Sequence, residues 1–392
     1  FIFYLAPSFT GGFPTRKEGS RNMASQAQRE KSIDRLMSLD VFRGFIMFWI
    51  VGGAAVVNRG LELIGDNPVT KLIAQQLKHS DWQGCRFEDL IWPSFMLMVG
   101  VSLPFAFAKR AGLGQSYSTI FSHAAKRSVI LFLLGSVRES VSEKQPYLIE
   151  LSSALQPIAI AYFVSFLLLR KSVKVQAIVA GSILLGYGLI LAFVPAPGIE
   201  AGTLIKDSNL VTALDKMILG RSHPAGWGTL LCTVPTISTT IFGVMIGQLL
   251  RSSRTSKNKM IILGMAGTGG VIIGLGLHYS FLPSIMKLWT SSYGLLSAGW
   301  ACLMLLFFYW VIDVLGWRKW GFGFMVIGMN AIAAYMGVSL FGSHISRMLK
   351  IFIDGTVSIL AAFGPLFEAA CIFSVRWLIL FWMYRRKIFI KV

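Results

Sequence analysis

A histidine and two acids stand directly before a long apolar run. Residues 75–105 read QQLKHSDWQGCRFEDLIWPSFMLMVGVSLPF and include His79, Trp82, Glu88 and Asp89. A neighbouring carboxylate fixes the tautomer of an imidazole and raises its basicity, so His79 beside an acid is a candidate base or nucleophile. Structural roles are the alternative, because a helix dipole favours acids in its first turn and tryptophans gather at membrane interfaces.

A second polar site lies near the start of an earlier apolar run. In SLDVFRG, Asp40 and Arg43 are three residues apart, which places them on one face of a helix. They could form a structural ion pair, or Arg43 could contact an anionic cofactor, because guanidinium pairs bidentately with phosphate. The residues alone therefore predict an intramembrane polar site whose reaction class stays open.

The elements that hold these residues are predicted to be membrane helices. Of the 392 residues, 54% are hydrophobic and only 14% are charged, whereas a soluble domain has about 25% charged residues. A helix needs about 20 apolar residues to cross a bilayer, and continuous apolar runs exclude the alternating strands of a barrel. We predict an all-α polytopic bundle of about ten spans, near residues 41–58, 88–108, 119–137, 148–169, 175–195, 228–250, 260–281, 294–315, 321–341 and 366–385.

Basic residues alternate between the connections. The segment before the first span is basic, and so is every second connection after it, at residues 109–110, 170–174, 251–259, 318–319 and 385–387. Because cytoplasmic loops carry the excess of Lys and Arg, both termini are expected in the cytoplasm and His79 on the outer side. The same alternation argues that the net charge of +19 does not reflect nucleic-acid binding.

The chain is expected to contain one folded domain. Residues 1–34 are predicted to be a flexible cytoplasmic extension, and residues 35–392 the transmembrane domain. The four cysteines lie far apart, and no two histidines have the i, i+4 spacing of helical metal ligands. We therefore predict neither a disulfide framework nor a metal site.

Two of these motifs together resemble a known family. RLMSLDVFRGF followed by HSDWQGCRFEDLIWPSFMLMVGVSLPF resembles the paired signature of the heparan-α-glucosaminide N-acetyltransferase family, including its bacterial DUF5009 type. The likeness continues in LQPIAIAYF, GMNAIAAY and YRRKIFIKV, and covers essentially the whole chain from Arg35 onward. The two first motifs together are specific, whereas each later one alone is a weak signal.

The resemblance implies a transmembrane acetyltransferase in a bacterial inner membrane. Such an enzyme takes acetyl-CoA from the cytoplasm and passes the acetyl group to the amine of a glucosamine-like sugar or glycan fragment on the other side. The family's catalytic histidine matches His79, which would act as general base or as acetyl carrier, with Asp89 orienting it. The resemblance further implies a homodimer.

The remaining site assignments follow from the same resemblance. Asp40, Arg43 and Asn330 are expected to contact the acetyl-CoA, and Trp82 and Glu88 the sugar. For Asn330, a hydrogen bond between helices is the alternative. The sequence departs from the family pattern at Gly52–Gly53, near the position of a family asparagine, and at Pro157, where many members have arginine.

Two other functions fit the same composition. A proton-coupled permease for an amino sugar would use His79 and the acids as a gate, and would be expected to have discontinuous helices near the membrane midplane and inverted repeats. No such repeat is visible in the sequence. A structural or regulatory membrane subunit is the third possibility.

Overall fold

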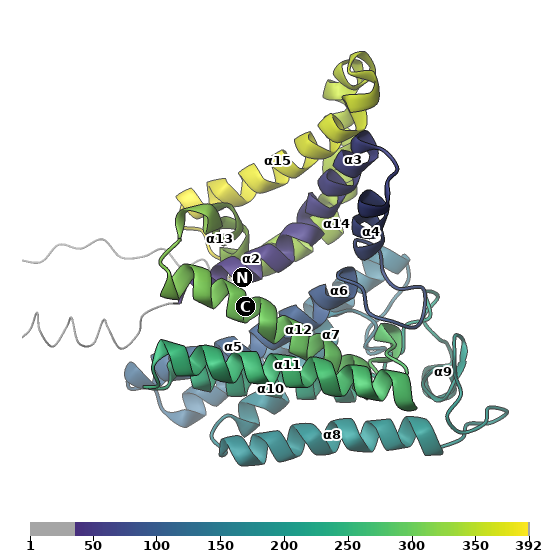
Figure 1. The fold of residues 1–392 in the computed structure, drawn as a ribbon, viewed down its shortest axis with the longest axis vertical. Helices are drawn as coiled ribbons and strands as arrows, with labels where there is room; N and C mark the ends of the chain where they lie inside the picture. Colours follow the sequence, from purple (N-terminus) through teal and green to yellow (C-terminus); the bar gives the residue numbers. More distant parts are fainter. Residues whose placement is uncertain (1–35, 391–392) are drawn as a thin grey trace, which may run out of the picture.

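The computed structural model describes residues 36–390, which form an almost entirely helical protein (Figure 1). The predicted extension, residues 1–34, lies outside the described residues. The α-helices in chain order are α2 (Met37–Phe48), α3 (Ala54–Ile64), α4 (Pro68–Gln76), α5 (Ile91–Gly112), α6 (Tyr117–Glu143), α7 (Leu155–Leu168), α8 (Val173–Phe193), α9 (Leu210–Leu219), α10 (Thr233–Arg251), α11 (Ser256–Ser280), α12 (Ser291–Phe308), α13 (Phe322–Met329), α14 (Ala331–Ile359) and α15 (Gly364–Arg385).

Short elements complete the described fold. The 3-10 and π-helical segments are η1 (Trp49–Gly53), η2 (Glu88–Leu90), η3 (Met286–Leu288), η4 (Tyr309–Val314), η5 (Lys319–Gly321) and η6 (Ala361–Phe363). The strands β1 (Leu204–Ile205) and β2 (Ser208–Asn209) pair antiparallel in a small hairpin.

Membrane-spanning helices account for most of the chain, as predicted. Within residues 36–390, eight helices are long and apolar enough to cross a membrane, and the pair α13–α14, bent by 64°, would be a ninth. The remaining predicted span, near 148–169, contains the 14-residue apolar helix α7. Each predicted run therefore contains a helix, and the prediction of an all-α polytopic bundle is confirmed.

The helices approach one another closely where both carry small residues. A Cβ added to Gly100 of α5 would lie 2.0 Å from the carbonyl oxygen of Thr240 on α10, and one added to Gly243 would lie 2.1 Å from that of Leu97. Gly44 of α2 is tighter still, since its Cβ would lie 1.7 Å from the carbonyl oxygen of Phe324 on α13. Small residues at such seams permit close helix packing in lipid, where no hydrophobic effect drives helices together.

The first span is broken near its middle. Gly52, in the π-helical segment η1, has φ +136°, a value that favours glycine. Arg376 of α15 donates from Nη1 to the carbonyl oxygen of Val51 (2.8 Å) and from Nη2 to the carbonyl oxygen of Gly342 (3.2 Å). Backbone groups in a membrane must be satisfied internally, so Arg376 stabilises the break by bonding a carbonyl beside it.

The connections gather at two ends of the bundle. At one end, which we call the His79 end, the segments 77–90, 144–154, 196–232 and 281–290 contact one another: Trp82 Nε1 donates to the carbonyl oxygen of Leu204 (2.7 Å), and the backbone N–H of Gly84 to that of Ser284 (2.8 Å). The basic connections lie at the other end, where Ser116, Ser172 and Thr255 cap the N-termini of α6, α8 and α11. The structure thus separates the two groups of loops as the charge pattern requires.

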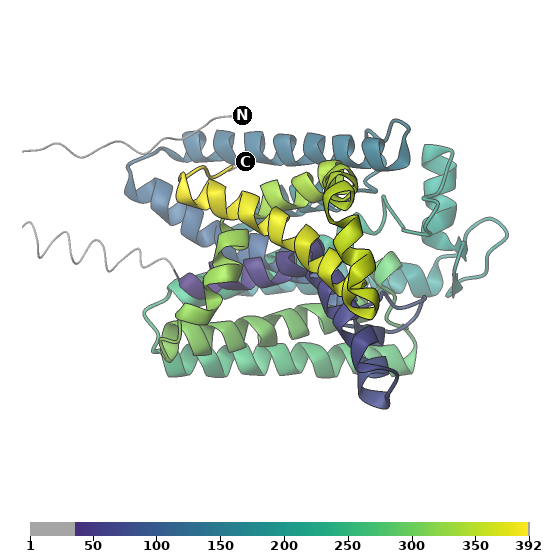
Figure 2. The same cartoon turned by 90° about the horizontal axis from the view of Figure 1, so that it is seen from above.

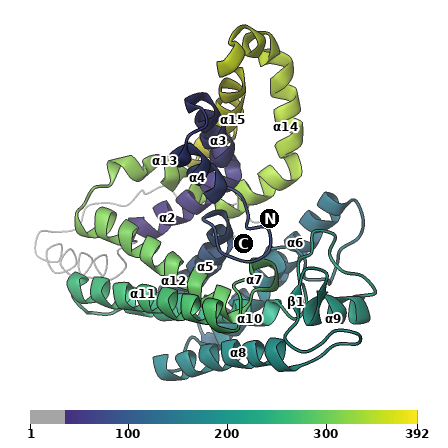
Figure 3. The same ribbon diagram turned by 45° about the vertical axis from the view of Figure 1, so that its right-hand side comes forward.

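Both ends of the described chain lie away from the His79 end. Phe322 of α13 contacts Tyr384 near the end of α15, with ring centroids 5.8 Å apart, and a Cβ at Gly321 would meet Val41 of α2. In Figure 3 the α14–α15 hairpin projects from the rest of the bundle, with α15 beside α3, and seen from above in Figure 2 it lies across the bundle. The side of the membrane that each end faces stays a prediction.

We expect Gly44→Ala to destabilise the protein, because the new methyl group must displace the α13 backbone. Overpacking of this kind costs about 1–3 kcal/mol. The matched control is Gly60→Ala on α3, where nothing lies within 4 Å of the added Cβ; it should be neutral or stabilising by up to about 1 kcal/mol. Thermal unfolding in detergent measures both, and equal unfolding temperatures for the two variants would contradict the packing.

Candidate active site

His79 and Asp89 form a hydrogen-bonded pair at the His79 end. Nδ1 of His79 lies 2.9 Å from Oδ1 of Asp89. The Asp89 side chain is fully buried, whereas the His79 side chain is 50% exposed. The sequence-predicted partners are thus brought together, with the imidazole reaching out from a buried anchor.

The hydrogen bonds to Asp89 determine which nitrogen of the His79 imidazole carries the proton. Asp89 accepts the backbone N–H of Ser80 and that of Arg86, the latter at 2.9 Å, and its own carbonyl oxygen accepts the hydroxyl of Tyr293. A carboxylate held by donors on all sides is an acceptor for the imidazole as well, so Nδ1 of His79 carries the proton. Nε2 then presents a lone pair toward the exposed side, where it can take a proton or attack an electrophile.

A nearby thiol is a poor competitor for this chemistry. Burial, helped by the negative charge of Asp89, raises the pKa of Cys85 to about 12. The thiolate is the reactive form of cysteine, so Cys85 stays protonated and unreactive at neutral pH. Of the two side chains, the imidazole is therefore the stronger candidate for a reactive group.

A tryptophan-lined pocket adjoins the imidazole. The ring of Trp227 lies edge-on to that of His79, with centroids 6.3 Å apart, and Trp227 contacts Trp92, which contacts Trp289. The pocket has an empty volume of about 310 Å³ that includes open solvent. It is lined by these three tryptophans and by Leu151, Ser152, Pro157, Gly228, Thr229, Cys232, Thr233, Thr236, Met286 and Lys287.

Several polar atoms of this pocket have no partner within residues 36–390. They are Nε1 of Trp92, Nε1 of Trp289 and Oγ of Ser152. A buried polar group without a partner is costly, so these atoms indicate that a polar molecule belongs there. Lys287 adds a positive charge, and burial together with the charge of Lys206 lowers its pKa. The pocket suits a small ligand that carries both apolar faces and polar groups.

The loop that carries Trp227 is fastened at several points. The carboxylate of Asp215 accepts the backbone N–H groups of Thr229 and Leu230, at 2.9 and 3.1 Å, and burial nevertheless raises its pKa. Arg221 forms an ion pair with Glu150, which lowers the pKa of Glu150 despite burial. Lys287 Nζ donates to the carbonyl oxygen of Ala225 (2.8 Å). These bonds fix Trp227 over the pocket.

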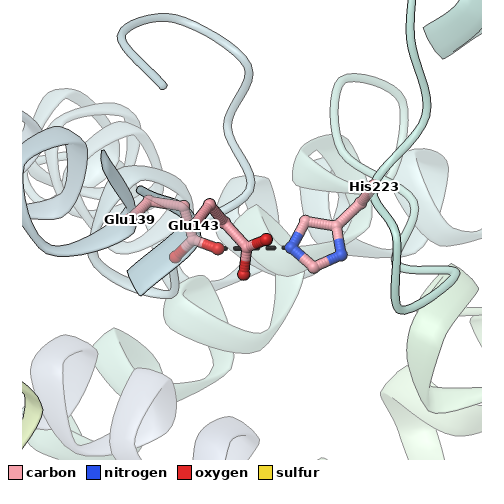
Figure 4. A group of neighbouring side chains, drawn as sticks. All are labelled: Glu139, Glu143 and His223. Atoms are coloured by element: carbon pink, nitrogen blue, oxygen red, sulfur yellow. Dashed lines mark hydrogen bonds and ion pairs between the residues drawn. The ribbon is translucent and has the colours of Figure 1, made fainter. Parts of the chain in front are cut away.

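A second polar cluster lies at the same end, between α6 and the Trp227 loop. Glu139 and Glu143 point toward His223 (Figure 4), and potential ligand atoms of the three lie within 4.8 Å of one another, as in a metal site. Nδ1 of His223, however, accepts the backbone N–H of Ala225 (3.1 Å), so the ring proton is on Nε2, which lies 3.2 Å from Glu139. A protonated Nε2 has no lone pair for a metal. The geometry therefore favours a structural hydrogen bond that joins α6 to the Trp227 loop.

The other sequence-predicted site residues are distributed along the bundle. Trp82 is held by β1 through its hydrogen bond to Leu204, while Oε2 of Glu88 is buried without a partner in the described residues. Arg43 bonds to Asp40 (3.3 Å) and to Ser102 Oγ of α5 (2.9 Å). Ser102 is thirteen residues from Asp89, or about 20 Å along a helix. Arg43, which bonds to Ser102, therefore lies far from His79 along the bundle.

Asn330 has partners of a different kind. Its Nδ2 donates to the carbonyl oxygen of Ile388, and its Oδ1 accepts the backbone N–H of Ile390, both at 3.0 Å. It also sits at the bend between α13 and α14. Its assignment to the cofactor stays a prediction; in the structure its amide hydrogen-bonds to the C-terminal segment.

The sequence did not indicate Trp227, Trp289 or Lys287 as site residues. They come from loops about 140 to 210 residues away from His79, and no periodic pattern marks them. The only available signal was that each lies in a predicted outer loop, as His79 does.

We expect neither EDTA nor added zinc to change the unfolding temperature of the purified protein, because the bond from Ala225 keeps the Nε2 proton on His223. Differential scanning fluorimetry measures this directly. A zinc-dependent rise that disappears in His223→Gln, which cannot replace an imidazole ligand, would show that the cluster binds metal.

Comparison with known proteins places the chain beside two curated enzymes. No protein-family model matches it. It is 24% identical over 382 residues to human heparan-alpha-glucosaminide N-acetyltransferase and 24% identical over 391 residues to the mouse protein of the same name. These alignments cover 81% and 83% of this chain but 54% and 56% of the relatives, so the chain spans a little over half of their length. At the level of a family, the chain is therefore related to heparan-alpha-glucosaminide N-acetyltransferase.

Proposed function

We propose that the chain is a membrane-embedded acetyltransferase. It would move an acetyl group from cytoplasmic acetyl-CoA to the amine of a glucosamine-like sugar or glycan fragment on the outer side of a bacterial inner membrane. The observation that carries the proposal is the His79–Asp89 pair, whose half-exposed imidazole adjoins a pocket with unpaired polar atoms. The family relationship supports the reaction class.

The charge pattern supports the direction of transfer. The basic connections lie opposite the His79 end, and cytoplasmic loops carry the excess of positive charge. On this basis acetyl-CoA would enter from the end away from His79, and the sugar would reach the tryptophan-lined pocket from the outside. The proposed contacts of acetyl-CoA are Asp40, Arg43 and Asn330. Arg43 is the cation among these three. A homodimer, implied by the resemblance, is part of the proposal.

Two routes for the imidazole are consistent with the geometry. As a base, Nε2 of His79 accepts a proton from the sugar ammonium, and the free amine attacks the thioester carbonyl. The C–S bond then breaks, and the second amine proton passes to the departing sulfur, which gives the amide and the CoA thiol. As a carrier, Nε2 itself attacks the thioester carbonyl and releases the thiolate, which takes a proton from the sugar ammonium. The free amine then displaces the imidazole from the acetyl group, and its second proton passes to the departing Nε2. In both routes Asp89 stabilises the positive charge that develops on the ring.

We expect His79→Ala and Asp89→Asn each to lower kcat for acetyl transfer by about 10²–10⁴. The first removes the imidazole. The second puts an amide beside Nδ1, and its N–H can donate to Nδ1 and so move the ring proton to Nε2. Transfer from acetyl-CoA to glucosamine by the purified protein measures it. The matched control for Asp89→Asn is Asp81→Asn, whose side chain is 98% exposed. Full activity in either site variant would remove that residue from the mechanism, and wild-type protein inactive on amino sugars and glycan fragments would contradict the proposed function.

The tryptophan-lined pocket is the proposed acceptor site, which Trp82 and Glu88 would border. Sugar rings pack their apolar faces on aromatic rings and need hydroxyl partners, which the unpaired atoms of Trp92, Trp289 and Ser152 would supply.

We expect Trp227→Ala to raise KM for the sugar by about tenfold, the size of one aromatic contact, and to leave KM for acetyl-CoA unchanged. Trp317→Ala, which removes a tryptophan that is 66% exposed, is the control. Steady-state kinetics with each substrate varied in turn separates the two constants. A change in the acetyl-CoA constant alone would place the donor, and not the sugar, in this pocket.

A proton-coupled permease is the second candidate, favoured by the break at Gly52 in the first span. Discontinuous helices line substrate sites in many transporters. Here, however, Arg376 of the chain itself bonds the carbonyl of Val51 beside the break. Uptake of labelled glucosamine into proteoliposomes without acetyl-CoA would favour the permease.

A further inference from the structure

The helix α4 connects the end of the first span with the loop that carries His79. Oδ1 of Asn67 accepts the backbone N–H groups of Val69 and Thr70, at 2.9 and 3.0 Å. In return, Oγ1 of Thr70 accepts the backbone N–H of Asn67 (3.0 Å). Such a capping box stabilises the first turn of a helix. α4 is therefore well formed, although within this fully described helix only Thr70 is buried.

Two faces of α4 differ in what surrounds them. Successive residues are about 100° apart around a helix, so Thr70 and Leu77 lie within about 20° of each other. Both are buried, and their face of the helix contacts the bundle. Val69, Leu72 and Ile73 form a second face about 100° wide, and these side chains are 64%, 58% and 40% exposed. This apolar face is thus left largely uncovered by the described part of the chain.

A polar face completes the helix. Lys71 and Gln75 are both exposed, and they lie about 40° apart on the part of the helix between the other two faces. Lys71 forms an ion pair with Asp66, with Nζ 3.5 Å from Oδ2. The apolar, polar and bundle faces are roughly 120° apart. α4 can therefore turn its apolar face to lipid and its polar face to water while its third face contacts the bundle, as a helix at a membrane interface does.

The first span brings α4 to the edge of the hydrocarbon core. From Met37 to Arg59 this span covers about 33 Å of helix, close to the roughly 30 Å thickness of a hydrocarbon core. Arg59 and Glu62 form an ion pair (2.8 Å) between two half-exposed side chains. Because charges are costly in the hydrocarbon, this pair is expected among the lipid headgroups. α4 begins six residues after Glu62 and so starts at the same level.

The direction of α4 fits such a position. In Figure 1, α8 and α11 extend horizontally, whereas α4 is upright near the ends of these spans on the His79 side. A helix that runs across the spans lies in the plane of the membrane. None of the residues of α3, all of which the structure describes, is buried, and Ile64 at its end is exposed. The surface beside α4 is therefore also open to lipid.

We propose that α4 is an interfacial helix that inserts Val69, Leu72 and Ile73 into the lipid leaflet on the His79 side. The partner is lipid, with acyl chains against the apolar face and headgroups and water around Lys71. The uncovered apolar face continues the lipid-facing surface of the first span, which is why lipid is the occupant that fits it. The inference does not depend on which reaction the protein catalyses.

Insertion of α4 would hold the reactive pair at the membrane surface. α4 ends three residues before His79, and the intervening Leu77 is buried. Oε1 of Gln76 accepts the backbone N–H of Phe87 (3.0 Å), which ties the end of α4 to the segment just before Asp89. The loop from residue 77 to residue 89 is thus fastened to α4. The His79–Asp89 pair would therefore stay at the level of the lipid headgroups.

The accessibility of nitroxide labels tests this inference in the full-length protein, reconstituted into phosphatidylcholine vesicles. Leu72→Cys places a label on the apolar face and Gln75→Cys places one on the polar face. Collisions of each label with oxygen, which concentrates in hydrocarbon, and with a nickel chelate, which stays in water, are measured by electron paramagnetic resonance. We expect the ratio of oxygen to nickel collisions to be several-fold higher at residue 72 than at residue 75.

Reference positions calibrate the measurement. Ile272→Cys places a label on an exposed residue of α11, within a membrane span, and gives the ratio expected in lipid. Wild-type protein treated with the same reagent gives the signal of the native cysteines, which is subtracted. If a variant at residue 72 or 75 does not fold, Val69→Cys and Lys71→Cys make the same comparison between the two faces.

The outcomes separate lipid from the other surroundings that α4 could have. A label at residue 72 that behaves like the one at residue 272, beside a water-exposed label at residue 75, would uphold the inference. Frequent nickel collisions at residue 72, or equal ratios at the two positions, would show that the apolar face is not inserted. Few collisions with either reagent at residue 72 would show that protein, such as a second copy of the chain, covers the face, and would overturn the inference as well.

Discussion

The hydrogen bond between His79 Nδ1 and the buried carboxylate of Asp89 is the interaction on which the account depends. It fixes the imidazole tautomer and leaves Nε2 facing outward. Asp89 can do this because the N–H groups of Ser80 and Arg86 hold its carboxylate. The local turn from residue 79 to residue 89 thus forms the His79–Asp89 pair, while loops distant in sequence form the wall of the tryptophan-lined pocket.

Membrane packing explains features that have no direct chemical role. Gly44 and Gly100 permit helix contacts that larger side chains would block. Arg376 brings a cation to the middle of α15, where it bonds Val51 beside the break at Gly52. A charge at such depth is costly unless it has partners, and Arg376 bonds to two backbone carbonyls and to the hydroxyl of Ser346. The broken span is thereby a stable part of the fold.

The sequence predicted what depends on local pattern. Apolar run length gave the helices, and the spacing from His79 to Asp89, joined to the family resemblance, gave the pair. The pocket could not be predicted, because Trp227 and Trp289 approach Trp92 only after the loops fold together. For Asn330, the resemblance suggested a contact with the cofactor, which stays a prediction; the sequence did not reveal that its amide bonds to Ile388 and Ile390. The apolar pattern likewise did not reveal the partners of Arg376.

Transfer across a membrane tests the central claim most directly. Proteoliposomes of one orientation would hold acetyl-CoA on the side of the basic loops and glucosamine on the side of His79, with neither substrate able to cross the bilayer. The account predicts N-acetylglucosamine only on the His79 side, and none when the two substrates exchange sides. Product formed with both substrates confined to the basic side, or formed equally in both arrangements, would contradict the account.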